Sequence, residues 1–128
     1  MQLGELEKLV LQYLWQHKEG NAKQVYSYFE KTRGGTLNTI QSTLDRLFKK
    51  DLLTRVKQGY AFVYSAKVER EALIAQLIEN VTSDFVGNSE HSLVAAFSSV
   101  SDKMSEQQLD ELEAMINQQR AQRNKQEG

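Results

Sequence analysis

Residues 37–50 constrain this chain more than any other stretch, because a helix built from them has two chemically different faces. At about 3.6 residues per turn, apolar side chains form a stripe on one side, and short hydrogen-bonding side chains gather on the other. The apolar stripe contains Ile40, Leu44, Leu47 and Phe48, and the polar face contains Asn38, Gln41, Ser42 and Asp45. A helix that is anchored on one side and free to enter a groove on the other is typical of helices that read DNA.

A β-hairpin is predicted directly after this helix. Residues 52–56 and 61–65 are rich in β-branched and aromatic side chains, and the turn between them contains Gly59. A polar-faced helix followed by a basic-tipped hairpin is the order of a winged helix-turn-helix, in which the helix enters the major groove and the hairpin lies along the backbone. We therefore predict a mainly α fold with a small β-hairpin wing.

Two further helices are predicted before the reading helix. Apolar residues at helical spacing indicate the first over residues 3–15, and Asn21 can cap a second, shorter one that reaches Lys31. A turn at residues 33–35 follows, and Thr36 is the expected N-cap of the reading helix. This part of the chain, residues 1–67, is predicted to be a winged-helix DNA-binding domain.

The remaining residues are predicted to form a helical dimerisation domain, residues 68–119. A long helix is expected from Val68 to Phe85, ended by residues 87–89, then a short segment around residues 93–97, and a last helix that begins at a capping box of Ser105 and Gln108. Three helices in about 60 residues enclose little core, so we expect a second copy to bury their apolar faces. The residues assigned to this surface are Leu73, Leu77, Ile78, Val81, Phe85, Phe97, Leu109, Leu112 and Ile116. Residues 120–128 are expected to be frayed.

The net charge of −1 is the sum of a positively charged N-terminal half and a negatively charged C-terminal half. Residues 1–68 hold 11 Lys and Arg against 6 Asp and Glu, whereas residues 69–128 hold 5 against 11. Such asymmetry indicates a basic binding module joined to an acidic one. The chain has no Cys, which excludes disulfides and thiolate metal sites. It also has neither a signal-peptide pattern nor an apolar run of the roughly 20 residues that cross a bilayer, so we expect a cytoplasmic protein with no membrane partner.

The reading helix resembles that of the penicillinase-repressor family, also called the BlaI/MecI/CopY family of bacterial transcriptional regulators. The matching pattern is Asn38-Thr39-Ile40-Gln41-Ser42-x-Leu44-x-Arg46-Leu47-x-Lys49-Lys50. The opening Leu3-x-x-Leu6-Glu7, the pair Leu14-Trp15, and a wing with Leu53-x-Arg55 and Tyr64 also resemble the family. The resemblance covers most of residues 3–116 and is most specific in the reading helix.

This resemblance implies a homodimeric repressor whose two winged helices occupy successive major grooves of a palindromic operator, with Thr39 and Arg46 as base or phosphate contacts. The chain departs from the family in two respects. Members that respond to copper carry paired Cys near the C-terminus, and this chain has none, so copper release is not expected. Members that respond to β-lactams are cut by a partner protease, typically between Asn and Phe. The corresponding pair here is Ala96-Phe97, which differs from the pattern that a sensor protease cuts.

Ten residues are the candidate contacts to double-stranded DNA. They are Thr36, Asn38, Thr39, Gln41, Ser42, Arg46, Lys49, Lys50, Arg55 and Lys57. Asn and Gln side chains pair best with adenine, and Arg55 and Lys57 lie where a wing meets the DNA backbone. Asp45, on the same face, either pairs with Lys49 or accepts a hydrogen bond from cytosine, and both interpretations stay open.

Nothing in the sequence indicates catalysis, a cofactor or a metal site. No Ser/His/Asp grouping or Gly-rich phosphate loop is present, and His17 and His91 lie in different predicted domains. The nearest approach to a metal site, Glu90-His91 beside Asp84, is expected to be a surface loop. We therefore predict a non-enzymatic dimeric repressor that occludes a promoter. The alternative is a winged-helix adaptor whose basic face binds an acidic protein.

Overall fold

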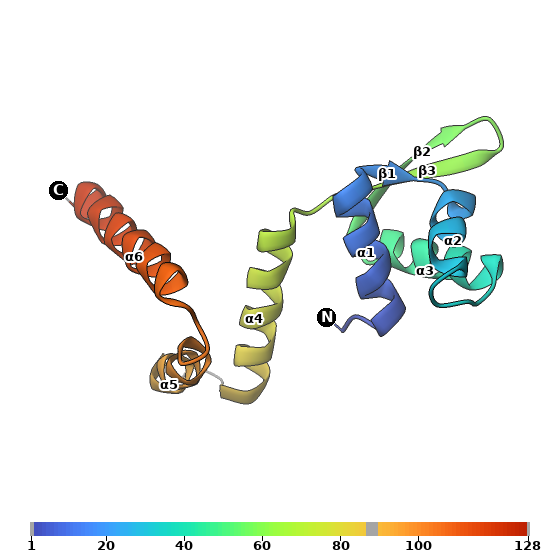
Figure 1. Ribbon diagram of the computed structural model, residues 1–128. Coiled ribbons are helices and arrows are strands. Elements are labelled where there is room, and N and C mark those ends of the chain that lie inside the picture. The colour runs from blue at the N-terminus through green and yellow to red at the C-terminus, as the bar shows by residue number, and fades with distance from the viewer. Residues whose placement is uncertain (1, 87–89, 128) are drawn as a thin grey trace. The chain divides into compact units, whose positions relative to one another are not determined.

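The computed structural model describes the backbone of residues 2–86 and 90–127, and the side chains of residues 2–83 and 94–126 (Figure 1). The chain divides into two compact units, residues 1–80 and 81–128. The first contains α1 (Glu5–His17), β1 (Glu19–Gly20), α2 (Ala22–Glu30), α3 (Leu37–Lys49), β2 (Leu53–Gln58), β3 (Ala61–Ala66) and the first part of α4 (Arg70–Val86). The second contains the end of α4, then α5 (Glu90–Ser101) and α6 (Glu106–Glu127). None of the described helices is long and apolar enough to cross a membrane.

The core of the N-terminal unit forms where the apolar faces of α1, α2 and α3 meet the small sheet. Its members come from these three helices, from the wing and from the start of α4, and they include Val10, Val25 and Leu44 of the apolar stripes that periodicity predicts. Tyr28, which was also assigned to such a stripe, is 47% exposed instead. The buried apolar residues are Val10, Leu11, Tyr13, Leu14, Val25, Phe29, Ile40, Leu44, Leu47, Leu52, Leu53, Tyr64 and Leu73. This core holds α3 so that its polar face stays outside.

Side-chain caps define where the predicted helices begin. The Thr36 hydroxyl accepts a hydrogen bond from the backbone N–H of Thr39 at 3.2 Å, which confirms Thr36 as the N-cap of α3. Asn21 and Gln24 form a reciprocal capping box at α2, with both hydrogen bonds 2.8 Å long. These short-range hydrogen bonds satisfy backbone N–H groups that have no partner within the helix.

The sheet has three strands in the order β1-β3-β2, one more than the sequence predicted. The predicted hairpin is confirmed: β2 and β3 are antiparallel and joined by the two residues Gly59 and Tyr60, with Gly59 at a φ of 64°. The extra strand, β1, pairs with β3 at Ser65 and Tyr64. A strand of two residues has no alternating pattern to detect, which explains why it was not predicted.

In the C-terminal unit, α6 begins at the predicted capping box. The backbone N–H of Ser105 donates to Gln108 at 3.0 Å, and that of Gln108 donates to Ser105 at 3.2 Å. The helix then continues to Glu127, so residues 120–127, which were expected to be frayed, are helical in the structure. The segment contains no Gly or Pro, and its Ala, Gln, Arg and Lys residues favour helix. Residues 87–89, the predicted end of the long helix, lie outside the described residues.

Leu73 differs from its predicted role in a dimer surface. Its side chain is only 3% exposed and belongs to the core of the N-terminal unit, and Leu77 packs against the same core. The first turns of α4 therefore complete the winged-helix unit. Ile78 and Val81, further along α4, are 54% and 57% exposed. The side chain of Phe85 lies outside the described residues.

Candidate nucleic-acid interface

The two faces of α3 have different environments. Its apolar side chains are buried in the core, and its hydrogen-bonding side chains lie on the exposed outer face. Ile40 is 4% exposed, and Leu44 and Leu47 are completely buried. Asn38 and Gln41, on the opposite side of the helix, are exposed. Amide side chains on the exposed face of a helix that the core anchors can donate and accept hydrogen bonds with base edges in a major groove.

Eight of the ten predicted contact residues are exposed. They are Thr36, Asn38, Thr39, Gln41, Ser42, Arg46, Lys49 and Lys57. Thr36 and Thr39 lie at the N-terminus of α3, where their hydroxyl oxygens are 2.9 Å apart. The free backbone N–H groups of a helix N-terminus favour an anion such as a phosphate. Lys57 extends the basic surface onto β2, the first strand of the wing.

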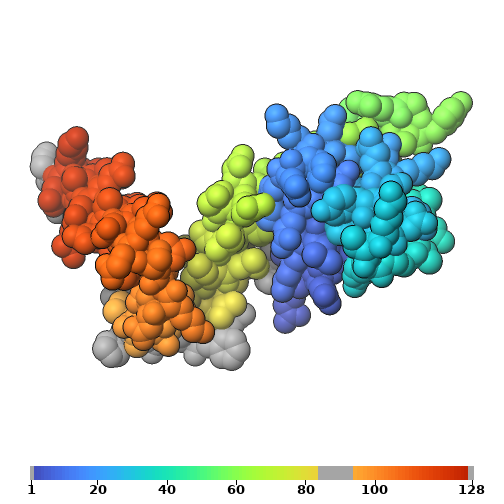
Figure 2. Space-filling model, viewed as in Figure 1, coloured from blue at the N-terminus to red at the C-terminus, as the bar shows by residue number. Residues whose placement is uncertain are grey.

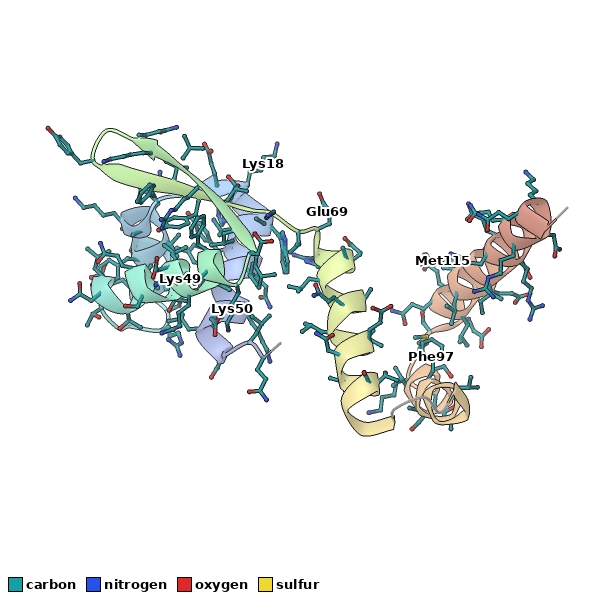
Figure 3. The ribbon with its side chains drawn as sticks, turned by 180° about the vertical axis from the view of Figure 1, so that it is seen from behind. Lys18, Lys49, Lys50, Glu69, Phe97 and Met115 are labelled. Atoms are coloured by element: carbon teal, nitrogen blue, oxygen red, sulfur yellow. The ribbon has the colours of Figure 1, made fainter. Side chains whose placement is uncertain are left out.

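Lys50 is held inside the fold and is not free for a partner. Its ammonium group lies 2.7 Å from the Glu7 carboxylate and donates to the Gln2 carbonyl oxygen at 2.8 Å. Burial alone raises the pKa of Glu7, but the hydrogen bonds from Lys50 and the Gly4 backbone outweigh it, so the pKa is lowered. Lys49 and Lys50, labelled in Figure 3, are adjacent, yet Lys49 has a side chain 74% exposed and Lys50 one only 32% exposed. Of these two predicted DNA contacts, Lys49 is therefore accessible, whereas Lys50 is engaged within the protein.

Arg55, on the first strand of the wing, contacts residues of both α3 and β3. Its guanidinium lies 3.9 Å from the ring centre of Phe48 on α3 and 4.2 Å from that of Phe62 on β3. It also lies 3.5 Å from the carboxylate of Asp45. A planar cation that contacts two aromatic rings and a carboxylate has little freedom to follow a DNA backbone. Arg55 thus fixes the wing against the reading helix.

Asp45 pairs with two cations. Of the two interpretations that the sequence left open, a pair with Lys49 or a hydrogen bond from cytosine, the unbound protein has the pair with Lys49. The carboxylate of Asp45 lies 3.0 Å from Lys49, one helical turn away, in addition to its contact with Arg55. The hydrogen bond from Lys49, aided by the charge of Arg55, lowers the pKa of Asp45. The carboxylate is therefore ionised at neutral pH, and its charge is offset by its two neighbours.

The structure adds Lys23, which the sequence did not single out, to a surface on which Gln41 and, more weakly, Tyr60 were expected to contact DNA. A groove of about 430 Å³ runs between the start of α2, α3 and the wing, and Lys23, Gln41 and Tyr60 are among its lining residues. Tyr60 is fully exposed at the wing tip, which protrudes at the edge of the molecule in Figure 2. Lys23 lies on α2, not on α3. Only the packing of α2 on α3 brings it to the groove beside Gln41.

Comparisons with known proteins agree with this geometry. A sequence profile described as "Penicillinase repressor" matches residues 3–118. The chain belongs to the penicillinase repressor family. It is 29% identical to the penicillinase repressor of Bacillus licheniformis over 111 residues, which are 87% of this chain and 86% of that protein. It is 31% identical to the transcriptional regulator BlaI of Mycobacterium tuberculosis over 77 residues, which are 59% of this chain and 56% of that protein.

The N-terminal unit also matches a solved structure, the DNA-binding domain of the repressor BlaI. The TM-score is 0.50 at 33% sequence identity, and the match covers 54% of this chain and 84% of that domain. This penicillinase repressor family member is thus a DNA-binding transcriptional regulator with a winged helix, and its family is one of repressors rather than enzymes. Among the described side chains, no three His, Cys, Asp or Glu residues gather as a metal site, and the candidate at residues 84, 90 and 91 lies outside them.

Proposed function

We propose that this protein is a homodimeric repressor that binds a palindromic operator through two copies of the winged helix. The observation that carries the proposal is the exposed polar face of α3, with Asn38 and Gln41 presented beside a basic wing. In this arrangement α3 enters the major groove and the wing follows the adjacent backbone. The match to the BlaI DNA-binding domain supports the same placement.

Dimerisation is proposed because the C-terminal unit leaves large apolar side chains exposed. Phe97 on α5 is 45% exposed, and Met115 and Ile116 on α6 are 61% and 44% exposed (Figure 3). Leu109 and Leu112 lie half-buried on the same helix. Apolar surface of this extent marks an interaction site, and a second copy of the chain would cover it symmetrically. Leu73 is left out of this surface because the N-terminal core already buries it.

Selection of bound fragments from random duplex DNA tests the proposal. We expect the selected fragments to share two inverted half-sites, about one helical turn or a multiple of it apart, with two protomers bound per duplex. A gel shift on the selected site then distinguishes the repressor from the alternative, an adaptor that binds an acidic protein. Absence of any duplex binding at low salt would exclude the repressor. Cleavage by a sensor protease is not part of the proposal, because the pair at the corresponding position is Ala96-Phe97.

Gln41→Ala is expected to reduce sequence discrimination at one position of each half-site. The variant removes an exposed amide that can form two hydrogen bonds with an adenine, so operator binding should weaken by roughly 1–3 kcal/mol per half-site, and binding to random DNA should change little. Competition gel shifts with operator and random duplexes measure both quantities. Equal losses on the two duplexes would show that Gln41 does not read a base.

Arg55→Gln is expected to lower stability without removing a phosphate contact. Losing the two contacts with aromatic rings should reduce the free energy of unfolding by on the order of 1 kcal/mol. Operator binding should weaken because the wing is no longer fixed, but its salt dependence should stay as in the wild type. Lys57→Gln is the matched control: it should leave stability unchanged and reduce the salt slope by about one per protomer. If Arg55→Gln instead reduced the slope and spared stability, Arg55 would be a phosphate contact.

A further inference from the structure

A cleft of about 580 Å³ lies within the N-terminal unit, on the side of α1 that faces the first turns of α4. Figures 1 and 2 show α1 and this part of α4 side by side. Two of the lining residues, Leu11 and Leu73, are buried core residues and form the apolar floor. The other apolar lining residues are Leu3, Trp15, Ile74 and Leu77. A cleft of this volume with an apolar floor has the size of small-molecule sites, which are about 300–1,000 Å³.

The polar residues that line the cleft are two cations, Lys8 and Arg70, and two amides, Gln12 and Gln16. Among the side chains that the structure describes, none of the lining residues is a carboxylate. The ion pairs found among the described side chains involve neither of these two cations. The described lining of the cleft therefore combines apolar residues with two cations that form none of these ion pairs.

Trp15 is held by a hydrogen bond at this cleft, and Arg70 lies over its ring. The indole N–H of Trp15 donates to the carbonyl oxygen of Val68 at 2.9 Å, which fixes the ring. The guanidinium of Arg70 lies over that ring, 5.4 Å from its centre. A guanidinium can bind a carboxylate through two parallel hydrogen bonds.

We propose that this cleft binds a small amphiphilic carboxylate, with its apolar body on the floor and its carboxylate at Arg70 and Lys8. The apolar floor selects a hydrophobic body, and the two cations, with no acidic residue in the described lining, select an anionic head. The site is separate from the outer face of α3, and the proposal does not depend on DNA binding.

Trp15 makes the site directly observable, because it is the only tryptophan of the chain. The probe is decanoate, titrated below its micelle concentration into the full-length protein while the tryptophan emission is recorded. Decanol and decyltrimethylammonium provide a neutral and a cationic head on the same tail. We expect a saturable change in emission with decanoate, weaker binding of decanol, and the weakest binding of the cation. Equal affinities for the three probes, or no saturable change with decanoate, would overturn the proposal.

Variants at the lining residues test whether the response comes from this cleft. Arg70→Gln should weaken decanoate binding by roughly fivefold and leave decanol binding unchanged, because only the charged head is affected. Ile74→Glu, at a wall residue that is 49% exposed, should prevent decanoate binding by adding a carboxylate to the wall. Lys103→Gln removes a cation from the C-terminal unit and should have no effect.

If both Arg70→Gln and Ile74→Glu bound decanoate with wild-type affinity, the assignment of decanoate binding to this cleft would be wrong. A decanoate response that disappears as the protein concentration rises would show that a second copy of the chain covers the cleft, and would likewise overturn the proposal.

Discussion

Ile116→Glu is expected to make the protein monomeric and to weaken operator binding by on the order of a hundredfold or more. The residue lies on α6 with 44% of its surface exposed, in the apolar surface that we propose is covered by a second copy. A carboxylate buried in an apolar interface without a partner is costly, so the dimer should dissociate. One winged helix alone then loses the advantage of a second binding event that is effectively intramolecular. Size-exclusion chromatography and a gel shift measure the two effects.

Gln118→Glu is the matched control for this experiment. It introduces the same side chain two residues away on α6, at a position about 200° around the helix from Ile116. The variant should remain dimeric and bind the operator as the wild type does. A monomeric Ile116→Glu protein with wild-type operator affinity would contradict the proposed role of dimerisation.

Operator binding is also expected to fall steeply with salt. The interface that we propose contains four exposed cations in each protomer, namely Lys23, Arg46, Lys49 and Lys57. If each neutralises one phosphate, the logarithm of the binding constant should fall against the logarithm of salt concentration with a slope of roughly −7 for the dimer. A fourfold rise in salt would then weaken binding about ten-thousandfold. Fluorescence anisotropy on a labelled operator over a salt series measures the slope.

The consecutive residues Lys49 and Lys50 provide the control for this prediction. Lys49→Gln should reduce the slope by about one per protomer, because the exposed pair of Lys49 with Asp45 is weak and a phosphate can replace the carboxylate. Lys50→Gln should leave the slope unchanged and instead lower stability, because it leaves the carboxylate of Glu7 without its cation. A wild-type slope near zero, or a single protomer bound per duplex, would contradict the dimeric repressor.

The fold of the N-terminal unit was predictable because its decisive signals are local. The two faces of α3 follow from the spacing of residues within one segment. The caps at Thr36 and Asn21 are hydrogen bonds between residues three positions apart, and the hairpin turn at Gly59 involves only its neighbours. The exposure of Asn38 and Gln41 on the outer face of α3 was predictable for the same reason.

Predictions that depended on contacts between distant segments were incomplete. The extra strand β1 exists only because β3 lies beside it, and α4 completes the N-terminal core through Leu73. Lys23 comes to the interface through the packing of α2. The sequence had identified none of these three features, since each requires knowing which elements are neighbours.

By itself, the sequence determined the helices and the wing of the N-terminal unit and which face of α3 is polar, because periodicity and capping act over a few residues. It did not determine the end of α6, which continues to Glu127. Only the tertiary structure decided which cations remain free on that face. Lys50 is paired with Glu7, which lies 43 positions earlier in the chain, and Arg55 contacts both Phe48 and Phe62. A long charged side chain binds whatever partner the fold brings within reach, so its role depends on packing rather than on its place in a motif.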